Sequence, residues 1–415
     1  MHVVDNSPFQ SWVNAVQDMD KVIDRFQLYC FQAEERCHLY RQGDQLADVK
    51  QRFASVLDSL AEQPRVYAIK GSMPVYITYS MVKSVLFSAA YAPSVFPTIA
   101  LVLDFLHRGL DLSALWRPID ISPLCEANPI NLQMLDPGDG GTAVLCGDQR
   151  FRVSARSVSS ESTKSRMPDL TVGPAEHNSS WAHCGAAEND RCIIFRRRRM
   201  LSFPRCRGRH PNHPKVFTIA SRCVGWDIDR VDPPSMDWNK FPLKDRDPVN
   251  TSFPILFVSN TRDPITPMRS GLEQSRKFAN AGFIEQRGEG HCSSSMVSLC
   301  TMSKIRAYLS KGVVPEPPRF DHANDAQGGL SGNWTTCEVD QRPWGVSGLH
   351  LHSDGKYSAE EVALLRAGAQ LQRTFKDWAH FLPGHPPGFG RLFEMDENEA
   401  QELHATSMRQ SMSDA

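Results

Sequence analysis

Residues 254–293 read PILFVSNTRDPITPMRSGLEQSRKFANAGFIEQRGEGHCS, and their pattern is the strongest indication of the fold class. Its apolar run at 255–258 predicts a short buried strand, after which Asp263 stands at the edge of a loop that contains two prolines. A helical pattern comes next, and a second short strand is expected at 283–286. Two glycines then lead to His291. The predicted order is strand, acid, helix, strand, histidine.

This order of an acid and a histidine is typical of an α/β-hydrolase, in which the acid follows one strand and the histidine follows the last. The acid orients the imidazole, and the imidazole deprotonates a nucleophile. Asp263 and His291 are therefore the candidate catalytic residues. The expected serine is missing, because the chain contains no G-x-S-x-G elbow. The predicted fold class is α/β, an incomplete α/β-hydrolase fold with a helical cap domain.

Each residue of this stretch also has a purely structural explanation. Asp263 can cap a helix N-terminus, and His291 can be an ordinary histidine of a surface loop. Cys292 is a poor candidate nucleophile, because a residue next to the histidine in sequence cannot easily face the same imidazole. Thr266 and Pro267 are expected to start the helix and to do no chemistry.

Residues 1–141 are predicted to form a helical cap region. Apolar residues recur at helical spacing near 12–26 and over 49–60, and two further apolar helices are expected at 79–90 and 95–106. A plain helical bundle has the same periodicity as a cap that covers a hydrolase site. Both interpretations stay open at this point.

Residues 142–214 are predicted to form a short strand at 142–148 and then an irregular insert. Ser, Arg and Pro dominate the insert, and four arginines stand at 196–199. A basic docking or nuclear-import patch, a zinc site, a disordered insert and translated intron sequence are the interpretations considered. The zinc candidates are Cys184, Cys192, Cys206, His210 and His213, whose spacings are wide for such a site.

A C-terminal α/β-hydrolase module is predicted over 215–345. It includes an amphipathic helix at 294–309, with Gly312 as its C-terminal stop signal. The remaining residues, 346–415, are expected to be a helical and partly disordered tail with one helix at 359–375.

The composition limits the function classes. A formal net charge of -1 argues against binding of nucleic acid through bulk charge. Apolar runs are too short for a transmembrane helix, and the first residues do not resemble a signal peptide. Sequons at Asn178, Asn250 and Asn333 are compatible with secretion.

The chain has 11 cysteines, and the sequence does not determine how they pair. The plausible disulfides are Cys30 with Cys37, Cys292 with Cys300 and Cys146 with Cys223.

Several segments resemble one family in the family's own order. They are DRFQLYCFQAEERCHLY (24–40), AVLCGD (143–148), CVGWD (223–227), PILFVSNTRDPITP (254–267), GEGHCSSSMVSLCT (288–301) and TTCEVDQRPW (335–344). The chain resembles the tripeptidyl-aminopeptidase-like α/β-hydrolases, which are placed with the prolyl-aminopeptidase-type serine peptidases. Coverage is roughly 1–148 and 215–345, and the region around Asp263 and His291 is the most specific part.

The resemblance implies a serine hydrolase that releases short peptides, with Asp263 as the triad acid and His291 as the base. The family's nucleophile would lie upstream of Met1, and residues 2–5, HVVD, look like the remnant of the strand after it. As written, the chain is therefore expected to be truncated and inactive. The alternatives are a non-catalytic degenerate relative, and an ester or lactone hydrolase of fungal small-molecule biosynthesis. The expected partner is a peptide or ester substrate, with no cofactor, no metal and no nucleic acid.

Overall fold

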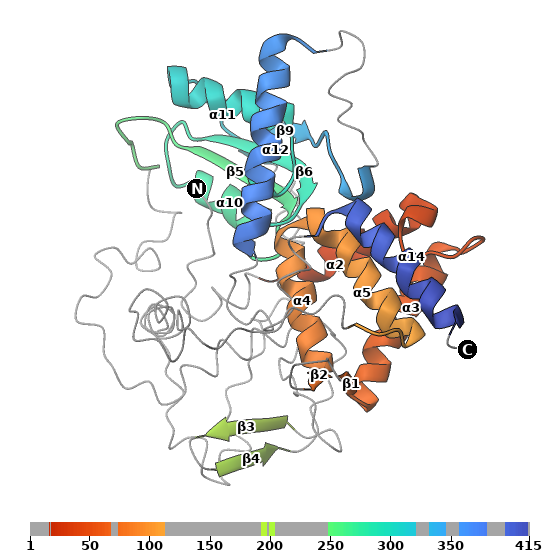
Figure 1. Ribbon diagram of the computed structural model, residues 1–415. Coiled ribbons are helices and arrows are strands. Elements are labelled where there is room, and N and C mark those ends of the chain that lie inside the picture. The colour runs from red at the N-terminus through yellow and green to blue at the C-terminus, as the bar shows by residue number, and fades with distance from the viewer. Residues whose placement is uncertain are drawn as a thin grey trace, which may run out of the picture.

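The structure is a computed structural model that combines a group of helices with a small parallel sheet (Figure 1). It describes residues 16, 18–67, 74–112, 192–196, 199–203, 248–320, 332–345, 357–379 and 395–413. The strand expected at 142–148 and the pair Cys146–Cys223 lie outside these residues, and so do the zinc candidates, of which only the backbone of Cys192 is described. The predicted domain boundaries stay predictions.

Four α-helices form where the apolar periodicity predicts them. Their bounds are α2 Met19–Ala33, α3 Leu46–Glu62, α4 Tyr79–Tyr91 and α5 Phe96–Arg108. The hydroxyl of Thr78 caps α4 by accepting a hydrogen bond of 3.2 Å from the amide of Met81. Gly109, at φ 72°, ends α5 in the left-handed conformation that glycine adopts at little cost. A short antiparallel hairpin, β1 Arg65–Tyr67 with β2 Val75–Ile77, joins α3 to α4.

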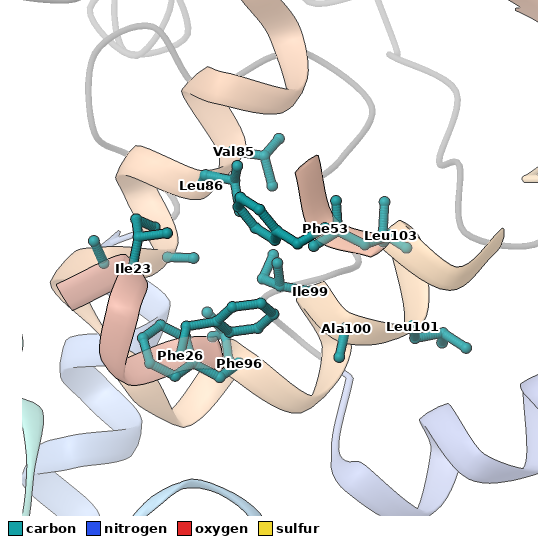
Figure 2. Packing of buried hydrophobic residues seen from close by; sticks show 14 of the residues in the cluster. Ile23, Phe26, Phe53, Val85, Leu86, Phe96, Ile99, Ala100, Leu101 and Leu103 are labelled. Carbon is teal, nitrogen blue, oxygen red and sulfur yellow. The ribbon is translucent and has the colours of Figure 1, made fainter. Parts of the chain in front are cut away.

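Aliphatic side chains and aromatic rings from several elements form the main hydrophobic core (Figure 2). The centroid of the Phe26 ring lies 5.2 Å from that of Phe96 on α5 and 5.8 Å from that of Phe53 on α3. It also lies 6.0 Å from the ring of Trp344, which belongs to the short 3-10 helix η8 Pro343–Gly345. The core therefore joins the helices to the segment that follows the sheet.

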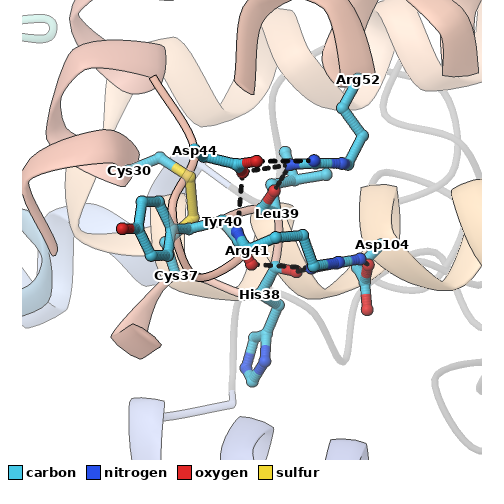
Figure 3. Close-up of a disulfide and its surroundings, with 9 residues drawn as sticks. All are labelled: Cys30, Cys37, His38, Leu39, Tyr40, Arg41, Asp44, Arg52 and Asp104. Carbon is cyan, nitrogen blue, oxygen red and sulfur yellow. Dashed lines mark hydrogen bonds and ion pairs between the residues drawn. A yellow bond between two sulfur atoms is a disulfide. The ribbon is translucent and has the colours of Figure 1, made fainter. Parts of the chain in front are cut away.

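A disulfide and ion pairs fix the loop between α2 and α3 (Figure 3). Cys30 is bonded to Cys37, as expected. Arg52 donates to Asp44 at 2.7 Å. Arg41, from the same loop, pairs with Asp104, whose side chain is completely buried on α5. Ion pairs thus connect this loop to α3, through Arg52, and to α5, through Asp104.

We expect the unfolding free energy to decrease as the pH falls from about 6.5 towards about 4, with His38 as one cause. Burial, and to a smaller extent the neighbouring His404, lowers the pKa of His38 from 6.5 to about 4. A protonated His38 is therefore favoured in the unfolded chain over that pH range, which costs folded-state stability. Urea unfolding at several pH values should give a shallower pH dependence for His38→Gln, and parallel curves for the two proteins would contradict the prediction.

Three parallel strands make the sheet, in the order β5 Leu256–Arg262, β6 Gly282–Glu289, β9 Thr335–Glu338. Phe257 and Phe283 pack on one face against Leu272 of α10 Met268–Ser275. On the other face, Ile284 packs with apolar side chains of α11 Leu299–Lys311. β5 and β6 are buried on both faces over most of their length, which explains the continuous apolar run in the sequence, whereas β9 at the edge buries Cys337 and exposes Thr336 and Glu338.

Three sequence predictions need correction. The helix expected from residue 294 begins at Leu299, because the hydroxyl of Ser298 caps it and residues 293–295 form the 3-10 helix η6 Ser293–Ser295. The insert at 149–214 contains a hairpin of β3 Cys192–Arg196 and β4 Arg199–Phe203, two segments rich in apolar residues suited to strands. The described part of the tail contains, besides α12 Ala359–Ala379, a helix that was not expected, α14 Glu397–Ser413.

The helix α14 is anchored through its partly buried face. Ala400 is buried, and His404 lies 2.8 Å from the Asp104 carboxylate of α5. This helix was not predicted from the sequence, because few apolar residues recur in it at helical spacing. Among the parts of the chain that the structure describes, no helix is long and apolar enough to span a membrane.

Candidate functional site

Asp263 and His291 meet at the C-terminal edge of the parallel sheet. Asp263 follows the last residue of β5 directly, and His291 stands two residues after the end of β6. Because β5 and β6 are neighbours and parallel, both loops emerge at the same edge. Open α/β sheets usually bind their ligands at this edge.

The carboxylate of Asp263 faces one nitrogen of the imidazole. Its two oxygens lie 3.1 and 3.2 Å from His291 Nδ1. The Asp263 side chain is 1% exposed and the His291 side chain 14% exposed, so the contact is largely shielded from water. A carboxylate in this position holds the ring orientation and stabilises an imidazolium if one forms.

Backbone amides on both sides fix the Asp263 carboxylate. Oδ1 accepts hydrogen bonds from the amides of Ile265 at 3.0 Å and Thr266 at 2.8 Å, and Oδ2 accepts one from the amide of Cys292 at 3.2 Å. The capping explanation of Asp263 is thus partly right, since it accepts amides of the following turn, although the N-cap of α10 is Pro267. Asp263 organises its loop and contacts the histidine at the same time.

The loop that carries His291 depends on a glycine and an asparagine. Gly290 has φ 99°, and a Cβ there would lie 2.6 Å from Pro93 and 2.7 Å from Ser295, so a side chain does not fit. Asn260, completely buried on β5, donates from Nδ2 to the carbonyl oxygens of Gly290 at 2.7 Å and Cys292 at 2.8 Å. The sheet therefore determines the path of the histidine loop.

Residues 214–321, which include Asp263 and His291, match the family model described as TAP-like protein. This segment is a TAP-like α/β-hydrolase domain. None of the curated proteins with which the chain was compared matches it. The matched range contains β5, α10, β6 and α11, whereas β9 and the helices α2 to α5 lie outside it.

Helices outside the TAP-like match complete the surroundings of His291. The amide of His291 donates to the carbonyl oxygen of Tyr91, at the end of α4, over 2.9 Å. The Tyr91 ring lies 5.1 Å from the imidazole, and the Phe375 ring of α12 lies 6.3 Å away. Burial raises the pKa of Tyr91, and Asp263 and Cys292 add to the effect, so its hydroxyl stays protonated. The helical region and the tail helix thus both contribute to the site.

The TAP-like domain keeps Cys292 as a protonated thiol. Burial raises the pKa of Cys292 to about 12, and the negative charge of Asp263 adds to the shift. A thiol in this state is a weak nucleophile. The expected pairing of Cys292 with Cys300 is wrong, because Cys300 is bonded to Cys337 and thereby ties α11 to β9. Cys292 forms no disulfide within the described residues.

Thr266 contacts both residues of the pair, which was not predicted from the sequence. Its hydroxyl donates to Asp263 Oδ2 at 2.7 Å and lies 3.2 Å from His291 Nδ1. Thr266 therefore touches both members of the pair, in addition to its place just before α10. A threonine three residues after an acid that ends a strand is the signal that could have shown this, because a turn of that length brings the hydroxyl back to the carboxylate.

The described part of the chain holds no group of three or more His, Cys, Asp or Glu side chains arranged for a metal ion. Of the sequons, Asn250 and Asn333 lie at exposed positions, and Asn178 is outside the described residues.

Proposed function

We propose that Asp263 and His291 are the acid and base of a serine hydrolase that cleaves short peptides from an N-terminus. The observation that supports this most directly is the contact of 3.1 Å between the buried carboxylate and Nδ1, at the C-terminal edge of two adjacent parallel strands. The TAP-like match supports the hydrolase class. The choice of peptides as substrates follows only from the resemblance to tripeptidyl-aminopeptidase-like enzymes.

The proposed reaction is acyl transfer. A serine hydroxyl attacks the carbonyl carbon, and His291 takes the hydroxyl proton at Nε2 and later gives it to the leaving amine. Asp263 keeps the ring in the required orientation and stabilises the imidazolium. Backbone amides stabilise the oxyanion of the tetrahedral intermediate.

The nucleophile of this reaction is not Cys292, because its thiol is protonated and its backbone amide is held by Asp263. The usual G-x-S-x-G elbow is absent from the 415 residues. We therefore propose that these 415 residues by themselves do not form an acyl-enzyme.

The test is labelling with a fluorophosphonate probe, which reacts with activated serines. We expect no stoichiometric label on the 415-residue chain. In a longer product of the gene that carries such an elbow, we expect one labelled serine, in that elbow. There, both Asp263→Asn and His291→Ala should abolish labelling, because an unoriented or missing base cannot activate the hydroxyl.

Two results would contradict the proposal. A labelled serine in the 415-residue chain would show a nucleophile elsewhere in this sequence. No label on any product of the gene would favour the non-catalytic relative. To distinguish the peptidase from an ester or lactone hydrolase, peptide anilides and p-nitrophenyl esters are compared as substrates. The protein used is the unlabelled form of the one that reacts with the probe. Faster turnover of peptides supports the peptidase.

A further inference from the structure

A polar cavity lies near the C-terminal ends of β5 and β6, lined by Arg25 and Tyr29 of α2 as well as by residues of these strands. Its volume is about 260 Å³. The four guanidinium groups that line it belong to Arg25, Arg262, Arg287 and Arg342, and the three carboxylates belong to Glu285, Glu289 and Glu338. Positive charge is thus in excess in this cavity. Arg262 directly precedes Asp263, and Glu289 stands two residues before His291, so the cavity shares its backbone with the candidate catalytic pair.

The two most deeply placed carboxylates are already occupied by donors of the protein. Glu289, with a side chain 2% exposed, accepts hydrogen bonds from the hydroxyl of Tyr29 at 2.6 Å and from Arg262 at 2.9 Å. Glu285 accepts one from Thr261 at 2.7 Å and one from the indole of Trp334 at 2.8 Å. These glutamates therefore complete the wall of the cavity and leave little capacity for a cationic ligand.

Two of the arginines, Arg25 and Arg342, have N–H donors that can bind a ligand. The guanidinium of Arg25, on α2, lies 3.7 Å from Glu289, and that of Arg342, after β9, lies 3.9 Å from Glu338. Both distances exceed that of a hydrogen bond, and among the described residues neither guanidinium has a hydrogen bond that the structure shows. Arg342 instead lies over the ring of Tyr29, 5.8 Å from its centroid. Their side chains are 33% and 35% exposed, so a ligand can reach them from solvent.

We propose that this cavity binds a small ligand through an oxyanion, a carboxylate or a phosphate, held between Arg25 and Arg342. A guanidinium presents its donors as a planar fork that matches the oxygens of either group. The two arginines come from α2 and from the segment after β9, so the ligand bridges the helical region and the sheet. The hydrogen bond from Tyr29 to Glu289 fixes the Tyr29 ring, over which the Arg342 guanidinium lies.

The test measures binding to the full 415-residue chain by calorimetry, at constant ionic strength. The probes are inorganic phosphate, trialanine with a free carboxylate, and trialanine amide. We expect phosphate or free trialanine, but not the amide, to bind with a Kd below about 1 mM. Phosphate binding alone identifies a phosphate site, and a preference for free trialanine over its amide identifies a carboxylate site.

Substitutions decide whether the binding occurs in this cavity. Arg25→Gln and Arg342→Gln should each weaken it at least about tenfold, because each removes a charge-assisted donor pair. Arg342→Lys keeps the charge but not the fork, and should weaken binding by less than Arg342→Gln. The control Arg319→Gln changes an arginine that is 79% exposed and pairs with Glu316, and this variant should bind like the unchanged protein.

Absence of binding by both anions would overturn the proposal. Equal binding by the unchanged protein, Arg25→Gln and Arg342→Gln would also overturn it, since the anion would then sit elsewhere. A thermal melt of each variant shows whether it is folded, and Arg342→Lys serves if a glutamine variant is not. No step of this experiment requires turnover, so its outcome is independent of the proposed hydrolase activity.

Discussion

Phe26→Ala is expected to lower the free energy of unfolding by about 3–5 kcal/mol, which is typical of a buried aromatic residue replaced by alanine. The Phe26 side chain is 1% exposed, and its ring contacts the rings of Phe53, Phe96 and Trp344. Those rings come from two other helices and from the segment after β9, so they cannot all move to fill the space. A large cavity remains, and the contacts between the helices and the sheet region are weakened together.

Urea unfolding followed by circular dichroism measures this effect. Phe253→Ala is the matched control, because it removes the same group from a side chain that is 75% exposed. We expect the control to change the unfolding free energy by less than about 0.5 kcal/mol. A Phe26→Ala protein as stable as the control would show that Phe26 does not join these elements.

The second large effect is expected for Asp104→Asn, at about 3 kcal/mol of lost stability. The carboxylate is completely buried and contacts Arg41, Arg108 and His404, which come from the α2–α3 loop, from α5 and from α14. In the asparagine variant, a neutral amide replaces the carboxylate, so these three side chains lose the negative charge with which they pair. The loss stays near the low end of the range for buried pairs, because the two guanidiniums are each 30% exposed and keep some contact with water.

Asp104→Asn is also expected to make α14 more sensitive to proteases. Without the carboxylate, His404 loses its partner on α5, so limited proteolysis should cut the residues around α14 sooner than in the unchanged protein. Glu402→Gln, at an exposed position of the same helix, is the control and should be cut at the original rate. Equal rates for all three proteins would show that Asp104 does not hold α14.

The pH dependence provides an independent check on Asp104. Burial alone would raise the pKa of this carboxyl, but His404, Arg41 and Arg108 outweigh it and hold the pKa below its ordinary value of 3.8. The stabilisation is therefore complete above about pH 4 and is lost as the pH falls through the lowered pKa. The stability difference between the unchanged protein and Asp104→Asn should shrink only in that acidic range.

Much of the candidate site was predictable from one stretch of sequence. Asp263 and His291 were found from the order of strands and loops, and the structure brings their side chains into contact. Thr266 was assigned no role beyond starting a helix, yet its hydroxyl lies against both residues. Tyr91 and Phe375 beside the imidazole were not predicted at all, because they come from helices far away in the chain.

The helices and strands with a local apolar pattern could be predicted from the sequence. The spacing of apolar residues along α2 to α5, and the run of residues in β5, depend on neighbours a few positions away, and that information is complete within each segment. Only the tertiary structure decided which distant surfaces meet. The bond of Cys300 to Cys337 spans 37 residues, and the contact of Asp104 with His404 spans 300. Such pairs depend on the packing of whole elements against one another, which the local pattern of a single sequence does not record.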